Sequence, residues 1–141
     1  MLARDYAQTY RSNAVLTASR GQLVLMLYDG VLKCLAIARD AFDRPSDDPR
    51  RIETINRQLL KAQAIITELQ DGLRVDAGGE FARTLQRLYD YHNRRLFEAN
   101  LRKQVEPVIE VEALVRDLRN AWAEMLCQQE VPAVQHRYAV A

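Results

Sequence analysis

Residues 49–71 read PRRIETINRQLLKAQAIITELQD and carry the clearest helical pattern in the chain. Their apolar residues follow one another at alternating steps of three and four positions, which places them on one face of an α-helix. Asp48 is typical of a helix N-cap, and Pro49 of the first helical turn, where a missing amide hydrogen costs nothing. The pattern predicts a helix over 49–71 with the inner stripe Ile52, Ile55, Leu59, Ala62, Ile66 and Leu69.

Three more segments show the same spacing and predict helices over 20–43, 79–102 and 107–127. Ser19 followed by Gln22 is typical of a capping box at the start of the first of these. Connections rich in polar residues, proline or glycine separate the segments. The expected inner stripes are Leu23, Leu27, Gly30, Cys34, Ile37 and Ala41, then Phe81, Leu85, Leu88, His92, Leu96 and Ala99, then Val108, Val111, Val115, Leu118, Trp122 and Met125.

The predicted fold class is all-α, an antiparallel up-and-down four-helix bundle. Short connections favour antiparallel neighbours, and no segment alternates apolar and polar residues with the period of a strand. We divide the chain into an N-terminal cap segment over 1–16, expected to be partly helical, the bundle over 17–127, and a tail over 128–141. The tail contains Pro132 and no apolar stripe, and we expect it to be flexible and disordered.

The composition is that of one ordinary soluble domain. The 141 residues include 20 Lys and Arg against 19 Asp and Glu, a net charge of +1. This balance provides no overall field that would attract nucleic acid or an anionic membrane. No export signal and no uninterrupted run of ~20 apolar residues is visible, and the two cysteines form no disulfide framework. We expect a cytoplasmic protein without nucleic-acid binding or membrane insertion.

The patterns that carry catalysis or metal binding do not occur in the sequence. A di-iron site in a bundle needs a Glu three residues before a His, but Tyr89 and Ala133 stand at that distance before His92 and His136. No nucleophile elbow or glycine-rich phosphate loop occurs. A small helical enzyme of the chorismate mutase kind would need charged residues on the inner stripes, which carry only His92. We therefore expect no enzyme, no cofactor and no metal.

The helix predicted over 20–43 has more apolar surface than one face of a bundle requires. Beside its inner stripe runs a second one, made of Val24, Val31, Leu35 and Phe42 and flanked by Leu25, Tyr28 and Leu32. Two interpretations are open: this helix is the innermost of the bundle, or its second face accepts an external segment. Tyr6 and Tyr10 of the N-terminal segment could cover that face, and a ligand would then have to displace them.

Ordered motifs occur in every predicted helix. The first part of the chain contains Tyr6-x-x-x-Tyr10, Ser12-Asn13, Gly21-Gln22-Leu23 and Leu25-Met26-Leu27-Tyr28-Asp29-Gly30. The later helices contain Lys61-Ala62-Gln63, Leu88-Tyr89-Asp90-Tyr91, Arg94-Arg95-Leu96, Ala99-Asn100 and Leu118-Arg119-x-x-Trp122. Together these motifs resemble the flagellar secretion chaperone family FliS. Two positions differ from the family pattern: Arg20 stands where proline is common, and His92 where an apolar residue is usual.

The resemblance implies a non-catalytic cytoplasmic chaperone with the flagellar export apparatus as a second partner. Members of the family bind the disordered C-terminal segment of flagellin, prevent its premature polymerisation and assist its delivery to the flagellar type III secretion apparatus. The contact residues that we expect are Tyr6, Tyr10, Val24, Tyr28, Val31, Leu32, Leu35, Leu96, Ala99 and Asn100. The alternative is a structural bundle subunit whose excess apolar surface is covered by self-association.

Overall fold

The computed structural model describes the backbone of residues 19–73 and 75–140 and the side chains of 19–73 and 79–128. Within these ranges the chain forms four helices and no strand: α2 (Arg20–Phe42), α3 (Pro49–Asp71), α4 (Val75–Arg102) and α5 (Glu106–Val140). The prediction of an all-α fold is confirmed. The predicted N-terminal cap segment, with Tyr6 and Tyr10, lies outside the described residues.

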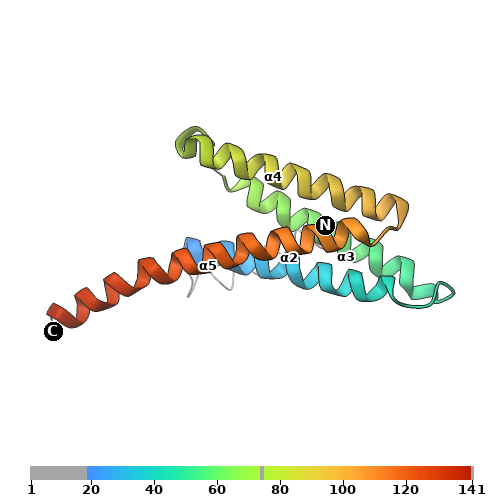
Figure 1. Cartoon of the computed structure of the whole chain (residues 1–141), viewed down its shortest axis with the longest axis horizontal. Coiled ribbons are helices and arrows are strands. Elements are labelled where there is room, and N and C mark those ends of the chain that lie inside the picture. The colour runs from blue at the N-terminus through green and yellow to red at the C-terminus, as the bar shows by residue number, and fades with distance from the viewer. Residues whose placement is uncertain (1–18, 74, 141) are drawn as a thin grey trace.

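The four helices form an antiparallel up-and-down bundle, as predicted. α2 and α4 each pack against both α3 and α5, so the helices form a ring in which each helix contacts two others. Figure 1 shows that the chain reverses direction at every connection. The α2–α3 and α4–α5 connections lie at one end of the bundle, and the α3–α4 connection lies at the other (Figure 1).

Local capping fixes where α2 and α3 begin. The Ser19 hydroxyl accepts a hydrogen bond from the Gln22 amide at 3.1 Å, and the Asp48 carboxylate accepts one from the Arg50 amide at 2.9 Å. Each bond satisfies an amide that the first helical turn would otherwise leave without a partner. The predicted starts of both helices are therefore confirmed.

α4 is interrupted near its start. Gly79 has φ 59° and ψ −137°, a backbone conformation that residues with a Cβ rarely adopt. The prediction of a helix from residue 79 located this break but missed the short helical stretch before it. The regular part of α4 therefore starts after Gly79 and continues to Arg102.

The core follows the predicted stripes along most of their length. Its buried residues come from all four helices and include Leu27, Cys34, Ile55, Leu59, Ile66, Leu85, Leu96, Val108, Val111 and Val115. Two residues predicted to point inward are instead exposed, Ile52 to 48% and Phe81 to 66%. Both stand near the start of their helices, where the neighbouring helices offer less surface to cover them.

Part of each apolar stripe of α2 is buried in the core of the bundle. Tyr28, Val31 and Leu35 of the second stripe and its flank are at most 2% exposed, and Cys34 and Ala41 of the first at most 5%. α2 packs against both α3 and α5, so both stripes have an internal partner. The middle of the second stripe is therefore covered within the bundle, while Val24, Leu32 and Phe42 stay partly exposed.

The apolar character of α2 has the same explanation. By length and composition α2 could cross a membrane, although no uninterrupted apolar run marks it as a span in the sequence. Its buried residues lie in the core that it shares with the other helices. Core packing accounts for the buried share of this helix, which is 39% of its most apolar window.

α5 continues beyond the end of its apolar stripe. Its backbone is helical to Val140 and projects past the bundle (Figure 1). The flexibility of the tail over 128–141 stays a prediction.

Candidate functional site

α4 and α5 are close together at one end and apart at the other. They converge on their connection, residues 103–105, and diverge toward the end of the bundle where α4 begins (Figure 1). We refer to these two regions as the connection end and the open end of the pair. They differ in the side chains that lie between the helices.

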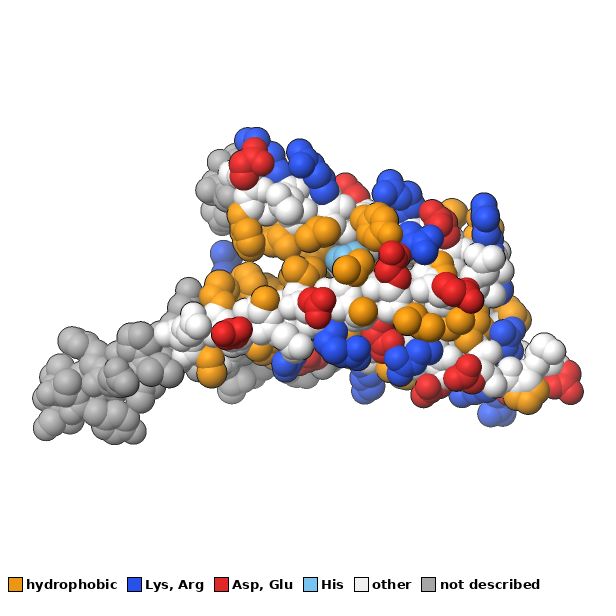
Figure 2. All heavy atoms as spheres, viewed as in Figure 1, with side chains coloured by type: hydrophobic (Ala, Val, Ile, Leu, Met, Phe, Trp, Pro, Cys, Tyr) orange, Lys and Arg blue, Asp and Glu red, His pale blue; other side chains and the backbone are white. Residues whose placement is uncertain are grey.

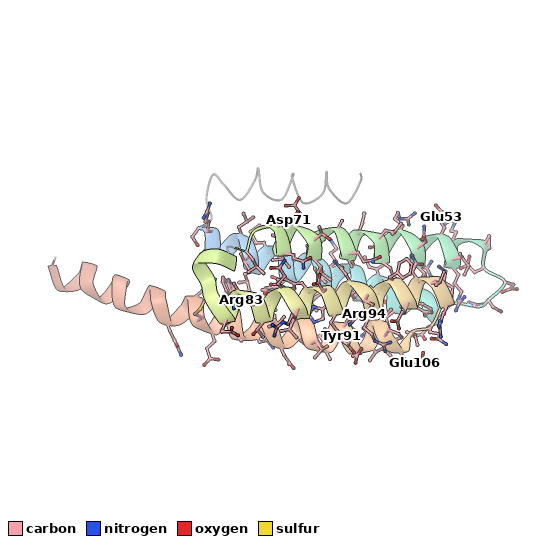
Figure 3. The ribbon with its side chains drawn as sticks, turned by 90° about the horizontal axis from the view of Figure 1, so that it is seen from above. Glu53, Asp71, Arg83, Tyr91, Arg94 and Glu106 are labelled. Carbon is pink, nitrogen blue, oxygen red and sulfur yellow. The ribbon has the colours of Figure 1, made fainter. Side chains whose placement is uncertain are left out.

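At the connection end, one carboxylate of α5 binds two side chains of α4. Tyr91 Oη donates to Glu110 Oε2 at 2.9 Å, and Arg95 Nε donates to Glu110 Oε1 at 2.7 Å. Figure 3 shows Tyr91 and Arg94 on the stretch of α4 that lies over α5. The hydrogen bond from Arg95 lowers the pKa of the Glu110 carboxyl, and the bond to that carboxylate raises the pKa of the Tyr91 phenol. Glu110 therefore stays charged and Tyr91 stays a donor, which holds the two helices together.

At the open end, each helix is bound to its other neighbour. Gln70 of α3 donates to the Asp90 carboxylate of α4 at 2.7 Å. The Trp122 indole of α5 donates to the Gly21 carbonyl of α2 at 2.8 Å. Among the described residues, no hydrogen bond or ion pair joins positions 79–90 of α4 to α5. At this end the two hydrogen bonds therefore join α4 to α3 and α5 to α2, and not α4 to α5.

Apolar side chains remain partly uncovered between α4 and α5 at the open end. Phe81 is 66% exposed although it stands on the inner stripe, and Leu114, one turn after Glu110 on α5, is 36% exposed. Figure 2 shows hydrophobic side chains gathered between the two helices and a hollow in the surface there. We define the α4–α5 cleft by these two residues and three that pack against the core while partly buried: Leu88, Leu118 and Trp122.

A second surface with exposed hydrophobic residues lies between α3 and α4. Leu60, Phe97 and Leu101 are each more than half exposed. Amide groups lie among them, and Asn100 Nδ2 donates to Asn56 Oδ1 at 2.9 Å. We define the α3–α4 groove, of about 360 Å³, by its lining residues Asn56, Leu60, Gln63, Phe97, Asn100, Leu101 and Lys103. Its four polar side chains make it more polar than the α4–α5 cleft.

His92 is a polar residue on the otherwise apolar inner stripe of α4. The side chain is fully buried, and neither ring nitrogen has a hydrogen-bond partner among the described residues. Its ring meets those of Tyr89 and Tyr91 edge-on, with centroids 6.2 and 6.4 Å apart. Burial lowers the pKa of His92 to about 4, against a smaller opposite effect of Glu110. The imidazole is therefore neutral near pH 7, with one N–H donor and one acceptor nitrogen.

Comparison with known sequences identifies the family of this bundle. The family model described as Flagellar protein FliS matches residues 2–130. The chain belongs to the FliS family. The flagellar secretion chaperone FliS of Bacillus subtilis is 39% identical over 117 residues, which cover 83% of each chain. The FliS proteins of Salmonella typhimurium and Escherichia coli are 38% and 41% identical over 86% of this chain, and the matches cover 87% and 86% of theirs.

FliS proteins are flagellar secretion chaperones, and the family assigns this chain an export-chaperone role rather than an enzymatic one. The resemblance drawn from the motifs is thereby confirmed. In the part of the chain that the structure describes, no three His, Cys, Asp or Glu side chains come together as metal ligands. Cys34 is buried and Cys127 exposed, and both are free thiols.

The structure places the expected contact residues of this FliS-family chain in different environments. Five of them are buried in the core: Tyr28, Val31, Leu35, Leu96 and Ala99. A partner could touch these five only if the bundle opened. Val24 and Leu32 of α2 are partly buried, and Asn100 lines the α3–α4 groove. Of the expected contact residues that the structure describes, Val24, Leu32 and Asn100 are therefore the ones that a partner can reach without such opening.

Tyr28 shows why a motif residue need not be a contact residue. Its hydroxyl lies 2.5 Å from that of Tyr89, so the two phenols join α2 to α4 across the core. Burial raises the pKa of both phenols, and both remain protonated. A phenol that is buried and bonded in this way stabilises the bundle.

The sequence did not mark the α4–α5 cleft as a site. Phe81, Leu88, Leu118 and Trp122 all fit the inner stripes and were therefore expected in the core. The sequence does contain a signal for the α3–α4 groove. Phe97 and Leu101 are large apolar residues that lie outside the inner stripe of their helix. Such residues on an outward face are the ones to examine first for partner contacts.

Proposed function

We propose that this FliS-family chain is a cytoplasmic chaperone for flagellin and binds the disordered C-terminal segment of flagellin in the α4–α5 cleft. Binding there prevents flagellin from polymerising early and keeps it ready for delivery to the flagellar type III secretion apparatus. The printed names of the relatives, flagellar secretion chaperones, support the general role. Flagellin as the client and the cleft as its site are our own assignments.

The observation that carries this proposal is the exposure of Phe81. A phenylalanine on the inner stripe of a bundle helix is expected to be covered, yet 66% of this residue is exposed. The partly buried Leu118 and Trp122 of α5 extend the same apolar surface. A disordered client loses conformational entropy when it orders, at a cost of ~2–5 kcal/mol, so it needs a long apolar surface of this kind.

A helical client segment fits the shape of the cleft. Amphipathic helices bind by laying an apolar face between two helices of a partner, with anchors at steps of three and four residues. The cleft supplies such a pair in α4 and α5, and its members Leu114 and Leu118 stand one turn apart. The client helix would lie between α4 and α5 and pack against both.

The expected contacts outside the core remain part of the proposal. Tyr6 and Tyr10 are proposed to cover client-binding surface in the free protein, so that the client displaces them. Val24, Leu32 and Asn100 are proposed as peripheral contacts, since each is partly exposed. The buried residues named above act indirectly, by fixing the positions of the helices.

Calorimetric titration of the full chain with a flagellin C-terminal peptide tests the proposal. We expect 1:1 binding with a negative heat-capacity change, because apolar surface is buried. Phe81→Asp should weaken binding at least 30-fold, since it places a charge in an apolar contact, and its high exposure should let the variant fold. The matched control is Leu101→Asp, an equally exposed apolar residue in the α3–α4 groove. Equal loss with both variants, or no binding to the full chain, would contradict the proposal.

The α3–α4 groove supports a second candidate, self-association through its exposed hydrophobic residues. Leu60, Phe97 and Leu101 could be covered by a second copy of the chain. Sedimentation velocity across a range of concentrations would show a dimer that Leu101→Asp dissociates. A monomer at all concentrations would exclude this candidate and leave the chaperone proposal intact.

A further inference from the structure

Trp122 of the α4–α5 cleft stands where α5 passes the start of α2. Its side chain is partly buried, so part of its surface packs on the core and part stays accessible. It is the one tryptophan of the chain. Tryptophan offers a large apolar surface with few rotatable bonds, and it is often a dominant contact residue in protein interfaces.

A backbone carbonyl of α2 fixes the direction of this indole. The Trp122 Nε1–H donates a hydrogen bond to the Gly21 carbonyl oxygen at 2.8 Å. The N–H edge of the ring therefore faces α2, and the ring cannot turn about its side-chain bonds without losing this hydrogen bond. A partly buried indole N–H without a partner would be unfavourable, so the ring keeps this direction in the free protein.

Gly21 also allows α5 to lie this close to α2. A Cβ added to Gly21 would overlap the Cδ2 atom of Leu126. Leu126 stands one turn after Trp122 on α5 and is partly buried. Its side chain thus occupies the space that the Cβ of any other residue at position 21 would fill.

The backbone conformation does not require glycine at position 21. Gly21 lies in the first turn of α2, and the glycine with a positive φ among the described residues is Gly79. Glycine weakens a helix relative to alanine. What Gly21 provides in return is close packing between the start of α2 and α5.

We propose that Gly21 is a positioning residue for client binding, which holds the Trp122 indole against its carbonyl so that the ring is pre-oriented in the wall of the α4–α5 cleft. Gly21 does not touch the client and acts through Trp122. This inference rests on the proposed function, because it requires a client in that cleft. A pre-oriented ring does not have to be ordered when the client binds, which strengthens binding.

Gly21→Leu tests the role of the missing side chain. The added side chain overlaps Leu126, moves α5 away from the start of α2 and breaks the indole hydrogen bond. The affinity for the flagellin C-terminal peptide should fall about threefold to tenfold, the range expected when one side chain has to be ordered on binding. Gly72→Leu is the matched control, because a Cβ at Gly72 makes contacts of 3.5 Å or more and displaces nothing.

A second substitution distinguishes positioning from a general loss of structure. In the variant that combines Gly21→Leu with Leu126→Ala, the space vacated on α5 accommodates the side chain added on α2. This double variant should recover the indole hydrogen bond and most of the wild-type affinity. A change that merely weakened the bundle would not be rescued, because Leu126→Ala removes further apolar contacts. Gly21→Ala, whose Cβ alone overlaps Leu126, replaces Gly21→Leu in the comparison if that variant does not fold.

The indole itself gives the spectroscopic readout, because one tryptophan gives one indole N–H signal in a 15N NMR spectrum. In free wild type this N–H should exchange slowly with water. Gly21→Leu should shift the signal and speed the exchange, and the double variant should reverse both changes. Calorimetric titration of the same full-length proteins with the flagellin C-terminal peptide measures the affinities.

Two results would overturn the inference while the proposed function stands. In the first, wild type binds the peptide and Gly21→Leu binds it equally well although its indole signal has moved. In the second, the indole signal of Gly21→Leu stays at the wild-type position, so Gly21 does not hold the ring. If wild type does not bind the peptide at all, the proposed function fails, and the role of Gly21 in client binding fails with it.

Discussion

The two ends of the α4–α5 pair differ in the contacts that the two helices make with each other. At the connection end, Tyr91 and Arg95 reach across to Glu110, and the layer beneath them is filled by Leu96. At the open end, α4 is bound to α3, α5 is bound to α2, and the hydrophobic residues between them stay partly exposed. One pair of helices thus combines a region that stabilises the bundle with a region available to a partner.

The difference indicates how a small bundle can hold an apolar binding surface without collapsing on it. At the open end the polar contacts of α4 and α5 go to their outer neighbours α3 and α2. The contact network at the connection end limits the separation from the other side. Substitutions at the two ends should therefore affect different properties, stability at one and client affinity at the other.

The largest expected effect on stability is at the connection end. Leu96→Ala should lower the free energy of unfolding by ~2–5 kcal/mol, since it removes a fully buried leucine and leaves a cavity. Phe81→Ala, a larger truncation at the open end, should change it by only about 0.5 kcal/mol, because that side chain is mostly exposed. Denaturant unfolding of both variants measures the two values. Similar losses would mean that Phe81 is covered in solution and that the ends do not differ.

The next effect concerns the layer between the two ends. Burial lowers the pKa of His92 to about 4, while the unfolded chain protonates it near 6.5. As the pH falls below 6.5 the unfolded state takes up a proton that the folded state refuses, so stability conferred by the neutral form is lost. Between pH 6.5 and 5, wild type should lose about 2 kcal/mol more than His92→Leu, at ~1.4 kcal/mol per pH unit.

Parallel unfolding curves at pH 7, 6 and 5 measure this difference. The comparison with His92→Leu removes the contribution of the carboxylates that both proteins share. Identical pH dependence of the two proteins would show that the imidazole of His92 is solvated in the folded state.

The smallest effect concerns the polar network at the connection end. Glu110→Gln should cost about 1 kcal/mol, because it weakens the bonds from Arg95 and Tyr91 in a partly exposed site. Glu98→Gln is the matched control, since Glu98 pairs with Arg95 within α4 and should cost less than ~0.5 kcal/mol. Both variants should bind the flagellin peptide as wild type does. A strong loss of affinity with Glu110→Gln alone would place the client at the connection end.

The helices themselves were predictable from the sequence because their signals are local. The caps Ser19 and Asp48 and the three-four spacing placed α2 and α3 almost to the residue. The break at Gly79 was visible as a pair of glycines. These features depend on neighbours within one or two turns, which the sequence contains in full.

The location of the partner surface was not predictable in the same way. An apolar stripe shows which face of a helix points inward, but not how far away the facing helix lies. Phe81 and Leu85 belong to one stripe and stand one turn apart at the open end, yet Phe81 is exposed and Leu85 is buried. The neighbours α3 and α5 cover part of the excess apolar surface of α2, and Val24, Leu32 and Phe42 stay partly exposed.

Hydrogen exchange of the full chain, with and without the flagellin C-terminal peptide, tests the central claim most directly. The peptide should slow exchange in α4 after Gly79 and in α5 around Leu114 to Trp122, which form the α4–α5 cleft. Exchange around Leu60 and Leu101, in the α3–α4 groove where Asn100 is only a peripheral contact, should change much less. Protection confined to the α3–α4 groove, with no change at the open end, would contradict the account.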